Sequence, residues 1–73
     1  MKSITPKVTE GQRVKLLPFE DQPEQHGFVE VVEYLVSEGT PYFMYIVRLY
    51  KEYVVEEYDD GIREVDEDQL EAL

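Results

Sequence analysis

Hydrophobic and polar residues alternate in several short stretches of this chain. Residues 13–16 read Arg-Val-Lys-Leu, which places Val14 and Leu16 on one face of a strand. Residues 42–53 are rich in Tyr, Phe, Ile and Val and predict the clearest strand of the chain. Alternation within that strand directs three side chains to one face: Tyr45, Val47 and Leu49.

Residues 28–35 predict another strand, but the alternation changes step inside it. Val29 and Val31 belong to one alternating set, and Val32 and Tyr34 belong to a second set an odd number of positions away. A β-bulge near Val31-Val32 would bring all four side chains to the same face. The β-branched valines favour a strand over a helix here.

Turn-forming residues divide the rest of the chain. Residues 37–41 have the composition of a turn, and residues 53–58 predict a further strand or the return arm of a hairpin. Asp59-Asp60-Gly61 predicts a hairpin turn, because glycine adopts a positive φ at little cost. Residues 62–65 predict the short closing strand. Five short strands with tight turns predict a mostly β fold, a small and strongly bent barrel.

The two ends of the chain differ in their predicted order. Residues 1–9 predict a flexible leader, and residues 10–73 predict a single domain. Near the C-terminus, residues 66–70 predict one helical turn with Asp66 as its cap. We expect Leu70 and Leu73 to plug the open end of the barrel.

Four segments of the chain carry a resemblance to a known fold: Gly11-Gln12-Arg13-Val14, residues 27–31, residues 45–49, and the ending from Gly61 to Glu71. In the order of these segments the chain resembles the SH3-like barrel superfamily, with the rhythm of Tudor and KOW modules. The resemblance covers roughly residues 8 to 72 and implies a small five-stranded barrel with a short C-terminal helical turn. It implies a fold rather than a function.

The net charge of −10 limits the classes of partner. A field of that sign repels nucleic acid and anionic membranes and attracts basic protein surfaces, although the same acidity also serves solubility. The chain has no cysteine, no charged-then-apolar N-terminal segment and no apolar run of the roughly 20 residues that a spanning helix needs. We expect a cytoplasmic protein that is a monomer or a weak homo-oligomer.

The inventory of reactive residues argues against catalysis. His26 is the single histidine, and the two serines, Ser3 and Ser37, fall in the leader and in a turn. A nucleophile and its base are therefore hard to assemble, and we predict no catalytic residue and no cofactor. The aspartates near residues 59–68 lack the spacing of a calcium loop, so no metal site is predicted.

The remaining candidates are aromatic and acidic residues in the second half of the chain. Exposed tyrosines next to carboxylates can receive Lys or Arg from a partner, although tyrosine is also simply a good strand former. The predicted protein-binding residues are Tyr42, Tyr50, Tyr53, Tyr58, Glu56, Glu57, Asp66 and Asp68. They predict a non-enzymatic binding module, or an accessory or regulatory subunit such as a small phage-encoded regulator.

Two other functions stay open. Nine acidic residues lie between Glu56 and Glu71, against Arg63 alone, and such a run can mimic a phosphate backbone and block a nucleic-acid-binding protein. It can equally be a solvated edge that discourages aggregation. The third possibility is a structural protein that assembles with its own copies through an unpaired edge strand.

Overall fold

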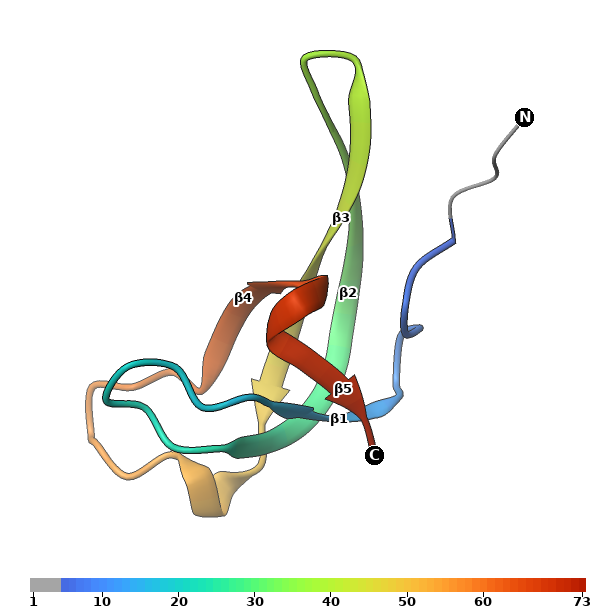
Figure 1. Ribbon diagram of the computed structural model, residues 1–73. Coiled ribbons are helices and arrows are strands. Elements are labelled where there is room, and N and C mark those ends of the chain that lie inside the picture. Colours follow the sequence, from blue (N-terminus) through green and yellow to red (C-terminus); the bar gives the residue numbers. More distant parts are fainter. Residues whose placement is uncertain (1–4) are drawn as a thin grey trace.

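The computed structural model describes residues 5–73 and contains one antiparallel sheet of five strands (Figure 1). The strands are β1 (Arg13–Leu16), β2 (Gln25–Ser37), β3 (Thr40–Leu49), β4 (Ile62–Asp66) and β5 (Leu70–Ala72). Two 3₁₀ turns are η1 (Lys51–Tyr53) and η2 (Glu67–Gln69). The predicted mostly β fold and the helical turn after residue 66 are confirmed.

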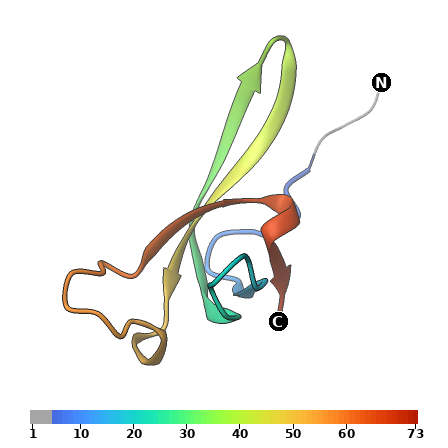
Figure 2. The same ribbon diagram turned by 60° about the vertical axis from the view of Figure 1, so that its left-hand side comes forward.

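The sheet has the strand order β4-β3-β2-β1-β5. Strands β1, β2 and β3 each pair with the next strand along the chain, and β5 then returns to the free edge of β1. The sheet is bent, and β4 crosses the base of the long β2–β3 hairpin (Figure 2). Strands β4 and β5 are the edges and do not pair with each other in the described residues, so the sheet is not closed.

One predicted strand is wrong, and a different segment completes the sheet. Residues 51–53 form η1, and residues 54–60 form a loop, where a strand over 53–58 was expected. Both edges of β3 are already occupied, by β2 and by β4, so this segment has no free strand edge beside β3 to pair with. Asp59-Asp60-Gly61 accordingly ends a wide loop instead of a tight hairpin, although Gly61 has the expected positive φ of 74°.

The core is a cluster of ten buried hydrophobic side chains. Its members are Val8, Val14, Leu16, Val29, Phe43, Tyr45, Val47, Leu49, Val65 and Leu70. The alternation in β1 and β3 therefore predicted the buried faces of both strands correctly. Leu70 is fully buried as expected, but Leu73 is 53% exposed, because β5 ends at Ala72 and releases the last residue.

A β-bulge interrupts β2, one step earlier than predicted. The pairing register shifts between Val29, which lies opposite Val47, and Val31, which lies opposite Ile46. The extra residue is thus Glu30. Val29 and Val32 face the core, whereas Val31 turns to the other face of the sheet and is 41% exposed. The predicted grouping of Val31 with the core valines is wrong for this reason.

Strands β2 and β3 continue beyond the other strands as a projecting hairpin (Figure 1). Its tip is Glu38-Gly39, whose φ values of 51° and 79° match a two-residue type I′ turn. Pro41 lies opposite Val36, one pair beyond the pair that flanks the turn. Backbone amides at that position point away from the partner strand, so a proline there costs no ladder hydrogen bond.

The segment before β1 is attached to the core. Val8 is 1% exposed and belongs to the hydrophobic cluster. Lys7 donates hydrogen bonds from Nζ to the carbonyl oxygens of Glu67 at 3.0 Å and Leu70 at 2.7 Å. The predicted flexible leader spans residues 1–9, of which residues 1–4 lie outside the described part; residues 7 and 8 pack against the domain.

Candidate protein-binding cleft

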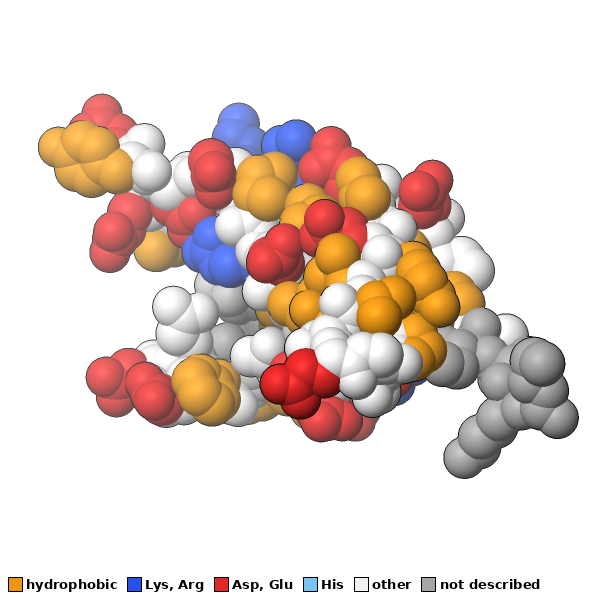
Figure 3. Space-filling model, turned by 90° about the horizontal axis from the view of Figure 1, so that it is seen from above, with side chains coloured by type: hydrophobic (Ala, Val, Ile, Leu, Met, Phe, Trp, Pro, Cys, Tyr) orange, Lys and Arg blue, Asp and Glu red, His pale blue; other side chains and the backbone are white. Residues whose placement is uncertain are grey.

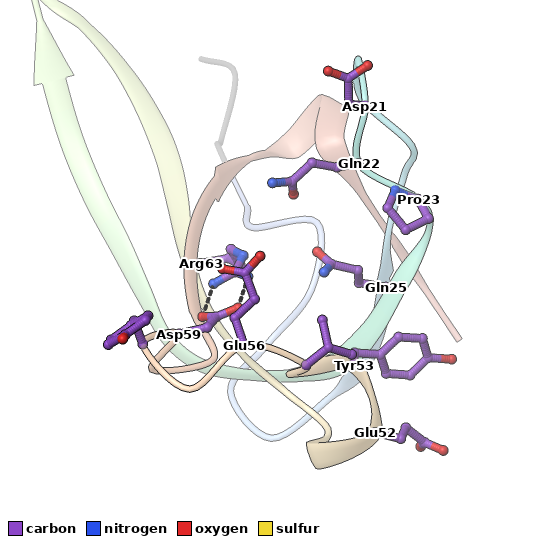
Figure 4. A pocket seen from close by; sticks show the side chains of 11 residues that line it. Asp21, Gln22, Pro23, Gln25, Glu52, Tyr53, Glu56, Asp59 and Arg63 are labelled. Atoms are coloured by element: carbon purple, nitrogen blue, oxygen red, sulfur yellow. Dashed lines mark hydrogen bonds and ion pairs between the residues drawn. The ribbon is translucent and has the colours of Figure 1, made fainter.

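Two loops on one side of the molecule enclose a cleft of about 520 Å³. One loop joins β1 to β2 (residues 17–24) and the other joins β3 to β4 (residues 50–61). In the view from above, the loops form two lobes with a notch between them (Figure 3). The lining residues are Asp21, Gln22, Pro23, Gln25, Glu52, Tyr53, Val55, Glu56, Tyr58, Asp59 and Arg63 (Figure 4).

The lining carries an excess of negative charge. It contains four carboxylates and a single cationic side chain, Arg63. Asp59 neutralises Arg63 through an ion pair at 2.6 Å. The other three acidic residues, Asp21, Glu52 and Glu56, make no ion pair with any described residue. The cleft therefore presents unbalanced carboxylates to whatever enters it.

The Asp59–Arg63 pair fixes the end of the β3–β4 loop. The guanidinium donates two parallel hydrogen bonds, from Nη2 to Oδ2 at 2.6 Å and from Nη1 to Oδ1 at 2.8 Å. Oδ1 also accepts from the backbone N–H of Gly61 at 2.8 Å. The hydrogen bonds from Arg63 lower the pKa of Asp59 to about 2, so its carboxylate stays charged over the physiological range. Arg63 is consequently held by its own chain.

Tyr53 anchors the other end of this loop against β2. Its ring lies 5.2 Å from the ring of His26, centroid to centroid. The Nε2 atom of His26 is 2.7 Å from Oε2 of Glu24, and this hydrogen bond lowers the pKa of Glu24. The backbone N–H of Tyr50 also donates to the carbonyl of His26 at 3.0 Å. These contacts hold η1 beside the β1–β2 loop and define one wall of the cleft.

Two hydrophobic side chains stand at the mouth of the cleft. Val55 is 87% exposed and Tyr58 is 95% exposed. Neither side chain contributes to the core, and exposure of large apolar groups to water is unfavourable. A partner that covered them would bury apolar area next to the carboxylates.

The cleft continues into the open seam of the sheet. A hollow of about 250 Å³ shares Gln22, Pro23, Gln25 and Arg63 with the cleft and reaches Leu16 of β1 and Val65 of β4. This hollow lies where β4 and the β1–β5 edge approach without pairing. The failure of the sheet to close thus adds depth to the cleft.

The structure divides the predicted protein-binding residues among different places. Tyr53, Glu56 and Tyr58 line the cleft, and Glu57 is exposed in the same loop. Tyr50 lies elsewhere: its hydroxyl accepts a hydrogen bond from Nε of Arg13 at 3.1 Å, and the guanidinium lies 5.8 Å from the centre of its ring. Tyr50 therefore has a partner within the chain.

Tyr42, Asp66 and Asp68 line a separate hollow of about 270 Å³ between the hairpin and η2. Asp66 caps η2 by accepting from the backbone N–H of Asp68 at 2.9 Å, and the Gln69 side chain accepts from the N–H of Asp66 at 3.2 Å. The predicted cap is confirmed. Since Asp66 serves this structural purpose, it is a weaker candidate for binding than Glu56.

Sequence reasoning missed the wall of the cleft that comes from the β1–β2 loop. Asp21, Gln22 and Pro23 of this loop, and Gln25 at the start of β2, are not among the predicted protein-binding residues. The available signal was the run Phe-Glu-Asp-Gln-Pro-Glu-Gln at residues 19–25, which joins an exposed aromatic ring to acidic and amide side chains. Its position opposite residues 52–58 depends on the bending of the sheet.

Comparison of the chain with protein-family models, curated proteins and solved structures found no match. Within residues 5–73, the helical elements are three-residue turns, and no helix has the length and apolar character needed to cross a membrane. The same residues contain no cluster of three or more side chains arranged to hold a metal ion.

Proposed function

We propose that the chain is a non-enzymatic protein-binding module, acting as an accessory or regulatory subunit, that holds a basic segment of a partner protein in the cleft. The observation that carries this proposal is the set of carboxylates without an ion pair among the described residues: Asp21, Glu52 and Glu56. A lysine or arginine that enters the cleft gains charge-assisted hydrogen bonds, which are stronger than neutral ones.

Hydrophobic groups support the same partner chemistry. Tyr53 and Tyr58 line the cleft together with Val55. The aliphatic stem of an arginine or lysine can pack on these side chains while its charged end meets the carboxylates. A cation over a tyrosine ring adds about 0.5–1 kcal/mol at an exposed site.

The charge of the whole chain supports rapid capture of such a partner. A net charge of −10 on 73 residues attracts a basic surface over distances of about 8–10 Å at physiological salt. Steering of this kind acts mainly on the association rate. The absence of cysteine in the sequence is consistent with action in the reducing cytoplasm.

The proposal includes a small SH3-like barrel as the architecture. It is supported by the bulged and bent β2 strand, the 3₁₀ turn η2 and the return of β5 to β1. Together they bring the two ends of the sheet toward each other. The binding cleft would then lie over the seam of the barrel.

Mimicry of nucleic acid is a weaker candidate, because several carboxylates of residues 56–71 have structural roles. Asp59 binds Arg63, Asp66 caps η2, Glu67 accepts from Tyr45, and Glu71 lies 3.6 Å from Lys15. Self-assembly through β4 or β5 is also weaker, since these edge strands have only five and three residues. The edge left for this alternative is the projecting part of β2, residues 31–37, which pairs with β3 alone among the described strands.

The test is a titration with a capped nonapeptide that contains three arginines, followed by NMR and calorimetry. A peptide with citrulline at the same positions is the control, because citrulline keeps the shape of arginine without its charge. We expect the arginine peptide to shift the amide signals of residues 21–25 and 52–58. The double substitution Glu52→Gln and Glu56→Gln should weaken binding of the arginine peptide about tenfold, which corresponds to a loss of about 1.4 kcal/mol. The control substitution Glu10→Gln should leave this affinity unchanged.

Equal binding of the citrulline peptide, or signal changes outside the two loops, would refute the cleft. Binding should weaken from 50 to 500 mM salt without vanishing, because the tyrosines and Val55 contribute a part that salt does not screen. Mimicry of nucleic acid is the better account if DNA displaces this chain from a partner protein and if high salt abolishes all binding to that partner.

A further inference from the structure

The outer face of the sheet, opposite the core, carries a second feature that the cleft does not explain. Pairing places side chains of β2, β3 and β4 in rows across this face. One row is Val31, Ile46 and Glu64, and the next is Glu33, Met44 and Asp66. The row beyond them, Leu35 and Tyr42, lies on the hairpin.

This face is more apolar than the solvent side of an antiparallel sheet. A one-sided sheet alternates between hydrophobic and polar residues. In β3, however, Tyr42, Met44 and Ile46 face outward, while Phe43, Tyr45 and Val47 are buried in the core. Such a strand has the composition of one that is covered on both faces. Nothing in the described residues covers its outer face.

A pair of carboxylates occupies the middle of the apolar face. Glu33 of β2 and Glu64 of β4 reach toward each other over β3, close enough to share a hydrogen bond when one of them is protonated. The Oε1 atom of Glu33 is buried and has no hydrogen-bond partner among the described residues. Hydrogen bonding to Glu64 and burial raise the pKa of Glu33.

No cation of the described chain compensates this pair. Met44 and Ile46 of β3 lie between the two glutamates and are uncharged, and Asp66 adds a third carboxylate to the same face. Arg48 is the nearest cation along β3, but its Nη2 is engaged with Glu30 at 3.1 Å. A buried acceptor without a donor, next to a like charge, is costly unless a partner supplies the missing cation.

We propose that this outer face binds an amphipathic helix of a partner protein, with a lysine or arginine of the helix seated on the Glu33–Glu64 pair. The dimensions fit: seven residues of β3 span about 20 Å and three strands span about 10 Å. A helix of about 14 residues has the same length and width. The apolar side chains around the pair would exclude water from the charged contact.

A second copy of this chain is a poor occupant for the face. Two copies would bring their Glu33–Glu64 pairs into one interface, each copy carrying a net charge of −10. The repulsion would oppose association. A basic helix offers complementary charge and complementary shape, and none of the residues that line the cleft between the loops belongs to the rows of the outer face.

The test uses a synthetic 17-residue amphipathic helix that has leucines on one face and a lysine at the centre of that face. A matched control peptide has norleucine in place of the lysine. We expect the lysine peptide to bind wild type about tenfold more tightly than the norleucine peptide. Glu33→Gln should abolish that difference and also raise the Tm of the free chain, because it removes the contact between two like charges. A structural role alone would not move stability and affinity in opposite directions.

Two further variants separate this face from other surfaces. Ile46→Thr keeps a β-branched residue and should weaken both peptides, whereas Val36→Thr on the opposite face of the hairpin should weaken neither. The cleft variant Glu52→Gln with Glu56→Gln should leave helix binding unchanged, so failure of one site does not imply failure of the other. Equal affinity of the two peptides, amide shifts confined to the cleft, or a peptide-free dimer in sedimentation would overturn the proposal.

Discussion

The hydroxyl of Tyr45 donates a hydrogen bond of 3.0 Å to Oε1 of Glu67, a residue 22 positions further along the chain. The same hydroxyl accepts from the backbone N–H of Lys7 at 2.8 Å. Since Tyr45 is fully buried at the centre of β3, this contact joins the core to both the N-terminal segment and η2. One oxygen atom thus couples three parts of the chain that are distant in sequence.

Tyr45→Phe keeps the ring in the core but removes both hydrogen bonds. We expect it to reduce the free energy of unfolding by about 1–3 kcal/mol, because the Lys7 amide and the Glu67 carboxylate lose their partner in a partly buried place. Chemical denaturation measures this loss. Tyr42→Phe is the control, since Tyr42 is 42% exposed and its hydroxyl makes no hydrogen bond with the described residues; an equal effect of the two variants would contradict the role of the buried hydroxyl.

Val8→Ala tests whether the segment before β1 belongs to the folded domain. Val8 is 1% exposed, so loss of its methyl groups should destabilise the chain by about 1–3 kcal/mol. Val36→Ala provides the comparison at a site that is 60% exposed, where we expect a much smaller change. A Val8→Ala chain as stable as wild type would mean that residues 7–9 behave as a flexible leader.

The Asp59–Arg63 pair predicts a defined dependence of stability on pH. The pKa of Asp59 falls from an ordinary value of 3.8 to about 2 in the folded chain. A carboxyl group with a depressed folded pKa stabilises the fold above its unfolded pKa, and this contribution is lost as the pH falls through the folded pKa. Asp59→Asn should therefore be less stable than wild type at pH 7, and the gap should close between about pH 4 and pH 2.

Urea denaturation at a series of pH values measures this closing gap. Asp60→Asn is the matched control, because Asp60 lies in the same turn and makes no ion pair with the described residues. A gap for Asp59→Asn that stays constant down to pH 2 would show that the ion pair does not stabilise the loop.

Gly27→Ala should be strongly destabilising for a steric reason. A Cβ atom at Gly27 would lie 2.3 Å from the backbone oxygen of Arg48, in the adjacent strand β3. Backbone must move to admit it, which we expect to cost about 1–3 kcal/mol or more. Gly39→Asn at the hairpin tip is the counterpart, since a Cβ there meets nothing within 4 Å and asparagine tolerates a positive φ. Comparable thermal stability of the two variants would argue against this close approach of β2 and β3.

Local patterns in the sequence were sufficient for the strands that are covered on one face. Alternation placed Val14 and Leu16 in the core, and it did the same for Tyr45, Val47 and Leu49 in β3. Asp66 could be recognised as a cap because the interaction that it makes lies within three residues. Each of these features depends on residues that are close in sequence.

Segments whose structure depends on a distant partner were predicted less well. Residues 53–58 have strand-forming side chains, but β2 and β4 occupy both edges of β3, the strand that precedes them, and they form a loop. Residues 70–72 have no strong strand signal, yet they pair with the open edge of β1. The β-bulge in β2 was predicted in part. The interrupted alternation of residues 28–35 indicated that a bulge exists, whereas the pairing with β3 determined that Glu30 is the extra residue.

The candidate sites show the same division. Composition alone determined an acidic chain with tyrosines in its second half, and so the basic character of the expected partner. Tertiary structure decided which of these residues meet, because the bend of the sheet places Asp21 across the cleft from Glu56 and directs Glu33 toward Glu64. Charge and periodicity can be read directly from the sequence, because they depend on residue types and on neighbouring positions. A cleft requires two loops to converge, and that convergence depends on strand pairing over long sequence separations.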